Sequence, residues 1–117
     1  MIRLFAALVA LAALAAQPSA AATTRLVASV GPGFTIKLKR SSGAAVRTLK
    51  PGTYTITVRD RSPAHNFHLI GPTNGLTRST TVRFVGTKTW RLRLVKGKYR
   101  FVCDPHIGSM KGTFTVR

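Results

Sequence analysis

Beyond residue 22, apolar and polar positions alternate with a period of two over most of the chain. The apolar positions are mainly aromatic or aliphatic residues, as in the runs 34–38, 54–58, 90–94, 99–103 and 114–116. Short segments with glycine, proline or serine separate the runs, at 31–33, 41–43, 50–52, 71–75 and 96–98. This alternation is typical of strands with one buried and one solvated face. The pattern predicts an all-β protein, an antiparallel β-sandwich of about seven or eight short strands.

The first 22 residues differ from the rest of the chain. Arg3 precedes an apolar run of 13 residues, 4–16, and small residues follow Gln17 and Pro18. We interpret residues 1–22 as a secretory signal peptide, because a membrane span needs about 20 apolar residues. The alternative is an uncleaved membrane anchor. The signal peptide predicts export to the periplasm or the cell exterior, and residues 23–117 are enough for one domain.

The chain is strongly basic, with 19 Lys and Arg residues against 2 acidic residues and a net charge of +17. Most of the cations occupy solvent-facing positions of the predicted strands. Such a charge attracts acidic redox proteins or an anionic envelope surface. No cluster of cations with interleaved aromatic residues is present, so we expect no specific binding of nucleic acid.

Candidate chemistry is concentrated in the segment CDPHIGSM, residues 103–110. It holds the chain's single cysteine, Cys103, together with His106 and Met110. A lone cysteine cannot form a disulfide within the chain, whereas thiolate, imidazole and thioether groups are the ligands that copper prefers. A complete site needs a second imidazole from another part of the chain.

The segment SPAHNFHLIG, residues 62–71, supplies that imidazole. Counting by two, His65 shares a face with Phe67 and Leu69, so we expect it to point into the core at the end of its strand. His68 then faces outward as a surface residue. Cys103 continues the buried register of the preceding strand. The pattern predicts that His65, Cys103 and His106 meet at one pole of the sandwich.

Four parts of the sequence resemble the cupredoxins of the plastocyanin and pseudoazurin type. They are AHN at 64–66, GKYRFVCDPH at 97–106, the following methionine and GTFTV at 112–116. The resemblance implies a cupredoxin-like Greek-key sandwich that binds one copper ion per chain. It implies four metal ligands: His65, Cys103, His106 and Met110.

Two positions depart from the family pattern. Three residues separate His106 from Met110, where plastocyanins usually have four, so the axial position of Met110 is the less secure assignment. Asp104 stands where the family usually has Ser or Thr. We expect its carboxylate to accept a hydrogen bond from Asn66 and to link the two ligand segments.

The sequence therefore predicts a mononuclear type 1 copper protein whose function is one-electron transfer between redox partners. It predicts no enzymatic activity, because only His68 remains for a further copper centre. The expected state is a monomer and the expected partners are acidic redox proteins. Three alternatives stay open, namely a copper carrier or sensor without rapid redox cycling, a basic polyanion-binding sandwich, and zinc as the bound metal. Trp90 is expected in the core and Asp60 in a turn.

Overall fold

The computed structural model describes residues 9–13, 23–73 and 76–117. Residues 9–13 form no helix or strand, and the rest of the predicted signal peptide lies outside the described residues. Within the described ranges, no helix is long and apolar enough to cross a membrane.

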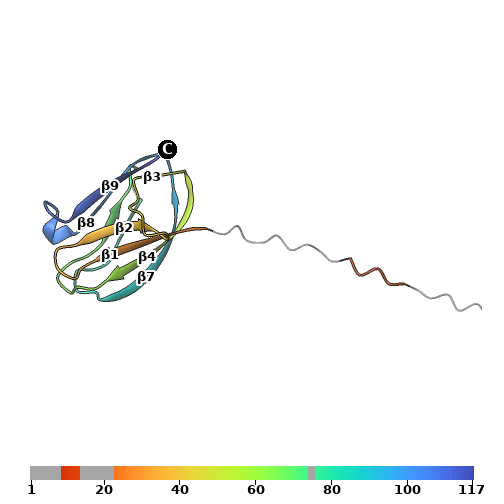
Figure 1. Ribbon diagram of the computed structural model, residues 1–117, viewed down its shortest axis with the longest axis horizontal. Helices are drawn as coiled ribbons and strands as arrows, with labels where there is room; N and C mark the ends of the chain where they lie inside the picture. The colour runs from red at the N-terminus through yellow and green to blue at the C-terminus, as the bar shows by residue number, and fades with distance from the viewer. Residues whose placement is uncertain (1–8, 14–22, 74–75) are drawn as a thin grey trace, which may run out of the picture.

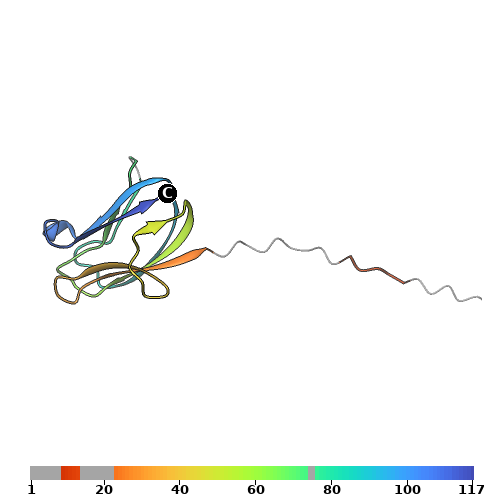
Figure 2. The same cartoon turned by 45° about the horizontal axis from the view of Figure 1, so that its top comes forward.

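Two β-sheets pack face to face (Figures 1 and 2). The first has the strand order β2-β1-β4-β7, with bounds β1 (Thr24–Val30), β2 (Ile36–Arg40), β4 (Gly52–Asp60) and β7 (Gly86–Leu94). The second has the order β3-β9-β8-β5-β6, with bounds β3 (Thr48–Leu49), β5 (His68–Ile70), β6 (Thr77–Ser79), β8 (Gly97–Val102) and β9 (Lys111–Val116). A single 3₁₀ turn, η1 (Asp104–His106), follows β8. The predicted β-sandwich is confirmed.

Two of the strand pairs are parallel, which the predicted antiparallel pattern did not include. β1 pairs with β4 in parallel, and β3 pairs with β9 in parallel. The cause is the path of the chain: after β2 it leaves the first sheet, adds β3 to the second, and returns to place β4 beside β1. The remaining pairs are antiparallel.

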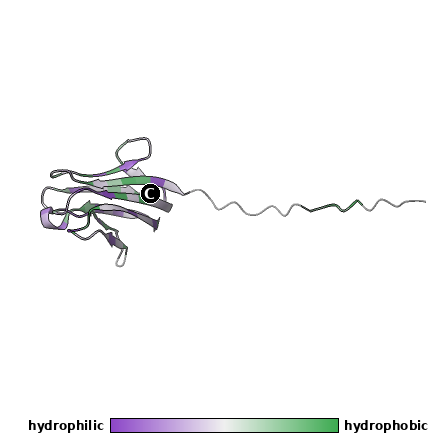
Figure 3. Ribbon diagram, turned by 90° about the horizontal axis from the view of Figure 1, so that it is seen from below, coloured by the Kyte–Doolittle hydropathy of each residue, from purple (hydrophilic) through white to green (hydrophobic). Residues whose placement is uncertain are grey.

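The core lies between the sheets and follows the alternation of the sequence, which Figure 3 shows as changing hydropathy along the strands. Leu26, Ala28 and Val30 of β1 are fully buried, while their neighbours in the strand are not. Aromatic rings stack across the second sheet, with Tyr99 and Phe114 at a centroid distance of 5.0 Å. Burial of such side chains is the main stabilising term of the sandwich.

Trp90 is only half-buried, although the sequence predicts it in the core. It lies on β7, the edge strand of the first sheet, so one side of its indole remains outside the sandwich. The other side packs against the core, with its ring 6.2 Å from that of Phe67.

Candidate metal centre

Three side chains with metal-binding donor atoms meet at one end of the sandwich: His65, Cys103 and His106. Cys103 directly follows β8, and His106 is the last residue of η1, which Figure 1 shows beyond the ends of the strands. Cys103 and His65 are buried, and His106 is half-buried. We call this end the metal pole and define it by four segments, 31–35, 60–67, 79–80 and 103–110.

The donor atoms form a nearly equilateral triangle. The Nδ1 atoms of His65 and His106 are 3.1 Å apart, and Cys103 Sγ lies 3.6 Å and 3.7 Å from them. The point equidistant from the three atoms is about 2.0 Å from each, close to the roughly 2.0–2.3 Å of metal–nitrogen and metal–sulfur bonds. A metal ion therefore fits in the plane of the donors. Two imidazoles and one thiolate form the trigonal set of a type 1 copper site.

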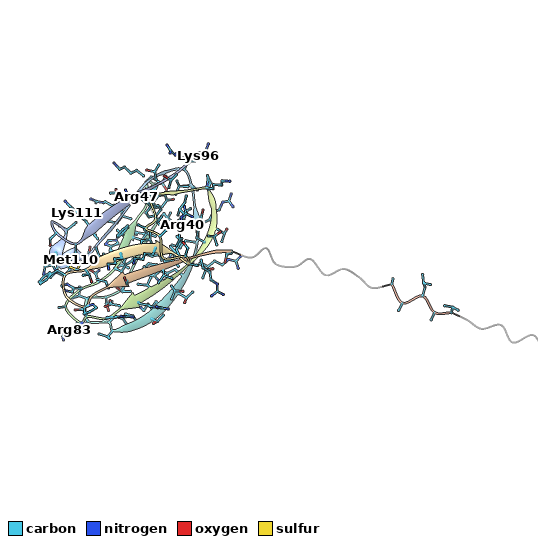
Figure 4. All side chains as sticks on the ribbon, in the orientation of Figure 1. Arg40, Arg47, Arg83, Lys96, Met110 and Lys111 are labelled. Atoms are coloured by element: carbon cyan, nitrogen blue, oxygen red, sulfur yellow. The ribbon has the colours of Figure 1, made fainter. Side chains whose placement is uncertain are left out.

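Backbone hydrogen bonds fold the segment 103–110 into a closed loop. Cys103 N donates to Met110 O at 3.0 Å, and Met110 N donates to His106 O at 2.8 Å. The Met110 side chain is fully buried, and Figure 4 shows it at the same end of the sandwich as this loop. The loop thus holds His106 by its own backbone, and the buried Met110 that closes the loop is a candidate axial ligand.

His65 lies in the loop before β5, not at the end of a strand as the sequence predicts. β5 begins only at His68, because the preceding backbone bonds to side chains instead of a neighbouring strand. Asn66 N donates to Cys103 Sγ at 3.5 Å, and Phe67 N donates to Thr80 Oγ1 at 2.9 Å. The predicted inward direction of His65 is nevertheless confirmed by its burial.

Asn66 and Asp104 join the two ligand segments, as the sequence predicts. Asn66 Nδ2 donates to Asp104 Oδ2 at 2.7 Å, and Asp104 N donates to Asn66 Oδ1 at 2.8 Å. The same Asn66 amide also donates to Thr80 O and Ser79 Oγ, both at 3.2 Å. Because these residues directly follow His65 and Cys103 in the sequence, the paired bonds fix the spacing of two donors.

His68 is not part of the donor triangle, which agrees with its predicted outward direction. Its Nδ1 lies 2.8 Å from Asp104 Oδ1, and its Nε2 lies 2.6 Å from Thr77 Oγ1. Burial alone would raise the pKa of Asp104. Hydrogen bonds from His68 and Asn66, together with the charge of His68, outweigh this effect and hold the pKa of Asp104 below its usual value. His68 thus supports the site through Asp104.

Asp60 is buried at the end of β4, although the sequence predicts a turn residue. Its carboxylate accepts hydrogen bonds from Ser62 N and from Thr80 Oγ1, both at 3.1 Å. Burial raises its pKa, and these two bonds partly oppose that rise. Through the buried Thr80 and Asn66, the buried Asp60 and the exposed Asp104 belong to one polar network at the metal pole.

Phe34 is the residue of the site that the sequence analysis missed, because the alternation assigned it to a strand. Phe34 is 69% exposed, and its ring lies edge-on to both imidazoles, with centroid distances of 5.1 Å to His65 and 5.0 Å to His106. Gly31 and Gly33 have positive φ angles of 70° and 68°, so the chain turns here and β2 begins only at Ile36. The GPG sequence just before Phe34 was the available signal.

Comparisons with known proteins show the fold. No family model and no curated protein matches the sequence. Solved structures with the same fold include the copper protein rusticyanin, at 20% identity and a TM-score of 0.58 over 81% of this chain and 78% of that chain. Rusticyanin from Thiobacillus ferrooxidans gives 22% identity and a TM-score of 0.56 over 81% and 77%. An oxidised amicyanin variant gives 18% identity and a TM-score of 0.52 over 79% and 81%. Both are cupredoxins, so this chain has the cupredoxin-like fold.

Proposed function

We propose that this protein transfers single electrons through one type 1 copper ion. His65, Cys103 and His106 would hold the ion, and Met110 would be its weak axial ligand. The observation that carries the proposal is the triangle of two Nδ1 atoms and one Sγ atom, which matches the size and chemistry of a type 1 site. In this reading the protein is an electron carrier and not an enzyme.

Copper bound to these donors would supply a Cu(I)/Cu(II) couple. The protein's own residues keep the donors in place: Asn66 and Asp104 tie the ligand segments together, and Asn66 N donates to the Cys103 sulfur. Donors held in this way change position little between two charge states, which lowers the reorganisation that accompanies electron transfer.

His106 gives the route to a partner. It is half-buried, and the neighbouring Ile107 is half-exposed. Together with the exposed ring of Phe34 these residues form an apolar rim at the metal pole, against which a partner can exclude water. We further propose that the protein is exported, acts as a monomer, and is steered to acidic redox partners by its positive charge.

The first test is a titration of the metal-free protein with Cu(II), followed by visible absorption. We expect an intense thiolate-to-copper band that saturates at one equivalent, and no such band for Cys103→Ser. A matched control is Ser109→Ala, an exposed residue of the same loop. If the wild-type protein is folded and shows no band, the copper assignment is wrong.

The second test separates electron transfer from copper storage. We expect rapid electron self-exchange between the Cu(I) and Cu(II) forms, measured by NMR line broadening. Tight copper binding with slow exchange would instead favour a copper carrier or sensor.

A further inference from the structure

The outer face of the first sheet carries a regular array of cations and hydroxyl groups. The outward positions of its four strands hold the cations Arg25, Lys37, Lys39, Arg59, Arg91 and Arg93. The other outward positions hold mainly hydroxyl residues, namely Ser29, Thr53, Thr55, Thr57, Thr87 and Thr89. We call this surface the cationic face.

The strand register places cations beside hydroxyl groups. Ser29 lies between Lys37 of β2 and Arg59 of β4. Four residues back along β1, on the same face of the sheet, Thr55 lies between Arg25 of β1 and Arg91 of β7. Neighbouring strands are about 4.8 Å apart, so a ligand that spans two strands can meet a cation and a hydroxyl group together.

No acidic side chain balances the cationic face. The chain has only two acidic residues, and both belong to the network at the metal pole. Among the described residues, the one ion pair with an acidic side chain is that of His68 and Asp104. The charge of the face is therefore available to an external anion.

One end of the cationic face is hollowed. The hollow is lined by four cations and by hydroxyl residues, among them Lys37, Lys39, Arg59, Arg61 and Thr35. Four cations around one depression favour the entry of an anionic group, which could then contact hydroxyl donors at the same place.

We propose that the cationic face binds an anionic polysaccharide, a polymer with both carboxylate or sulfate groups and hydroxyl groups. Arginine binds carboxylates in pairs of hydrogen bonds, and threonine hydroxyls match sugar hydroxyls. The outward strand positions contain no aromatic residue for stacking on nucleic-acid bases, and Val27 is their only apolar side chain, too little for insertion into lipid. This binding function goes beyond electron transfer and needs no metal.

The second sheet offers a matched control surface. Its outer side also carries cations, including Lys98, Arg100 and Lys111, but they are mixed with the apolar Ile70 and with the His68 and Asp104 pair. Cations also project elsewhere, as Figure 4 shows for Arg40, Arg83 and Lys96. A test must therefore separate the cationic face from net charge alone.

The experiment measures binding of the purified protein to alginate, a soluble uronate polymer, by isothermal titration calorimetry. One variant combines R59Q, R91Q and R93Q on the cationic face. The control combines K98Q, R100Q and K111Q on the second sheet, so both variants lose three positive charges. We expect the face variant to bind about tenfold more weakly at low salt and with a shallower salt dependence, and the control to stay near wild type.

Two outcomes would overturn the proposal. Equal weakening in the two variants would mean that net charge, not the cationic face, attracts the polymer. Equal or stronger binding to phosphatidylglycerol vesicles, to duplex DNA or to an acidic protein would mean that the face does not select polysaccharides. Each variant is also titrated with Cu(II); an intact copper band with lost alginate binding separates this function from that of the metal pole.

Discussion

The metal pole and the cationic face belong to the same sandwich but treat polar side chains in opposite ways. At the metal pole, Asn66, Thr80 and Asp104 are hydrogen-bonded to one another or to the ligand segments. On the cationic face, six cations have no acidic partner among the described residues. Hydrogen bonds between side chains fix the positions of the donor residues at the metal pole, whereas the cations without an acidic partner leave the cationic face able to bind an external anion. Both acidic residues of the chain belong to the hydrogen-bond network of the metal pole.

Asn66→Ala should have the largest effect on the metal pole. Asn66 is buried, and its amide serves Asp104, Thr80 and Ser79. Its removal breaks the paired hydrogen bonds to Asp104 and the bond to the carbonyl of the buried Thr80, so we expect the free energy of unfolding of the metal-free protein to fall by about 2–3 kcal/mol. Urea denaturation measures this.

The control for Asn66→Ala is Thr57→Ala on the cationic face, which should change the free energy of unfolding by less than about 0.5 kcal/mol. Similar losses in both variants would contradict the contrast between the two regions.

Thr80→Val should have the next largest effect and lower the free energy of unfolding by about 1–2 kcal/mol at neutral pH. The hydroxyl of Thr80 donates to Asp60 and accepts from Phe67 N, and valine keeps its shape but not these bonds. The bond to Thr80 lowers the pKa of Asp60, so its loss should raise that pKa further above the ordinary 3.8.

The Thr80→Val loss should also depend on pH. A group with a raised pKa gives its stabilisation in full below the unfolded pKa and loses it as the pH rises through the folded pKa. The difference in unfolding free energy between wild type and variant should therefore be smaller near pH 3 than at pH 7. Denaturation at both pH values tests this, and an equal difference would show that Asp60 is not coupled to Thr80.

Met110→Leu should cost about 1 kcal/mol or less in stability, because leucine and methionine have similar volumes. Its informative effect is on the metal. If Met110 is the axial ligand, the variant should keep its copper and show a higher reduction potential in cyclic voltammetry, since a weak donor to Cu(II) is lost. An unchanged potential would mean that Met110 belongs to the core and not to the metal centre.

Phe34→Ala should have the smallest effect on stability, below about 0.5 kcal/mol, because the ring is largely exposed. It should nevertheless open the edges of His65 and His106 to solvent. We expect added azide to perturb the visible spectrum of the Cu(II) form at lower concentrations than in wild type. Phe34→Leu, which keeps an apolar cover, is the control and should behave more like wild type.

The core and the donor set could be predicted from the sequence because both follow local patterns. Alternation placed the buried residues of the strands, and it gave His65 its inward direction. Three soft or borderline donors within eight residues indicated the loop, and the structure brings His65, Cys103 and His106 together.

Other features depend on contacts between distant segments, which alternation does not contain. Asp60 lies on the same face of β4 as the buried Tyr54, Ile56 and Val58. Its burial could not be predicted because its hydrogen-bond partner Thr80 lies 20 residues away in the sequence. Phe34 was assigned to a strand, whereas its place at the metal pole depends on contacts with His65 and His106 from distant parts of the chain. The parallel pairing of β1 with β4 likewise depends on the path of the chain between the sheets.

The metal pole lies at the ends of the strands, whereas the cationic face is the outer surface of the first sheet and runs parallel to its strands. A molecule held on a polymer by that face would lie with its strands along the surface, so His106 would point along the surface and not into it. Redox partners adsorbed on the same polymer could then reach His106 by diffusing along the polymer surface, without release into solution. The protein could therefore stay bound to the polymer while it exchanges electrons.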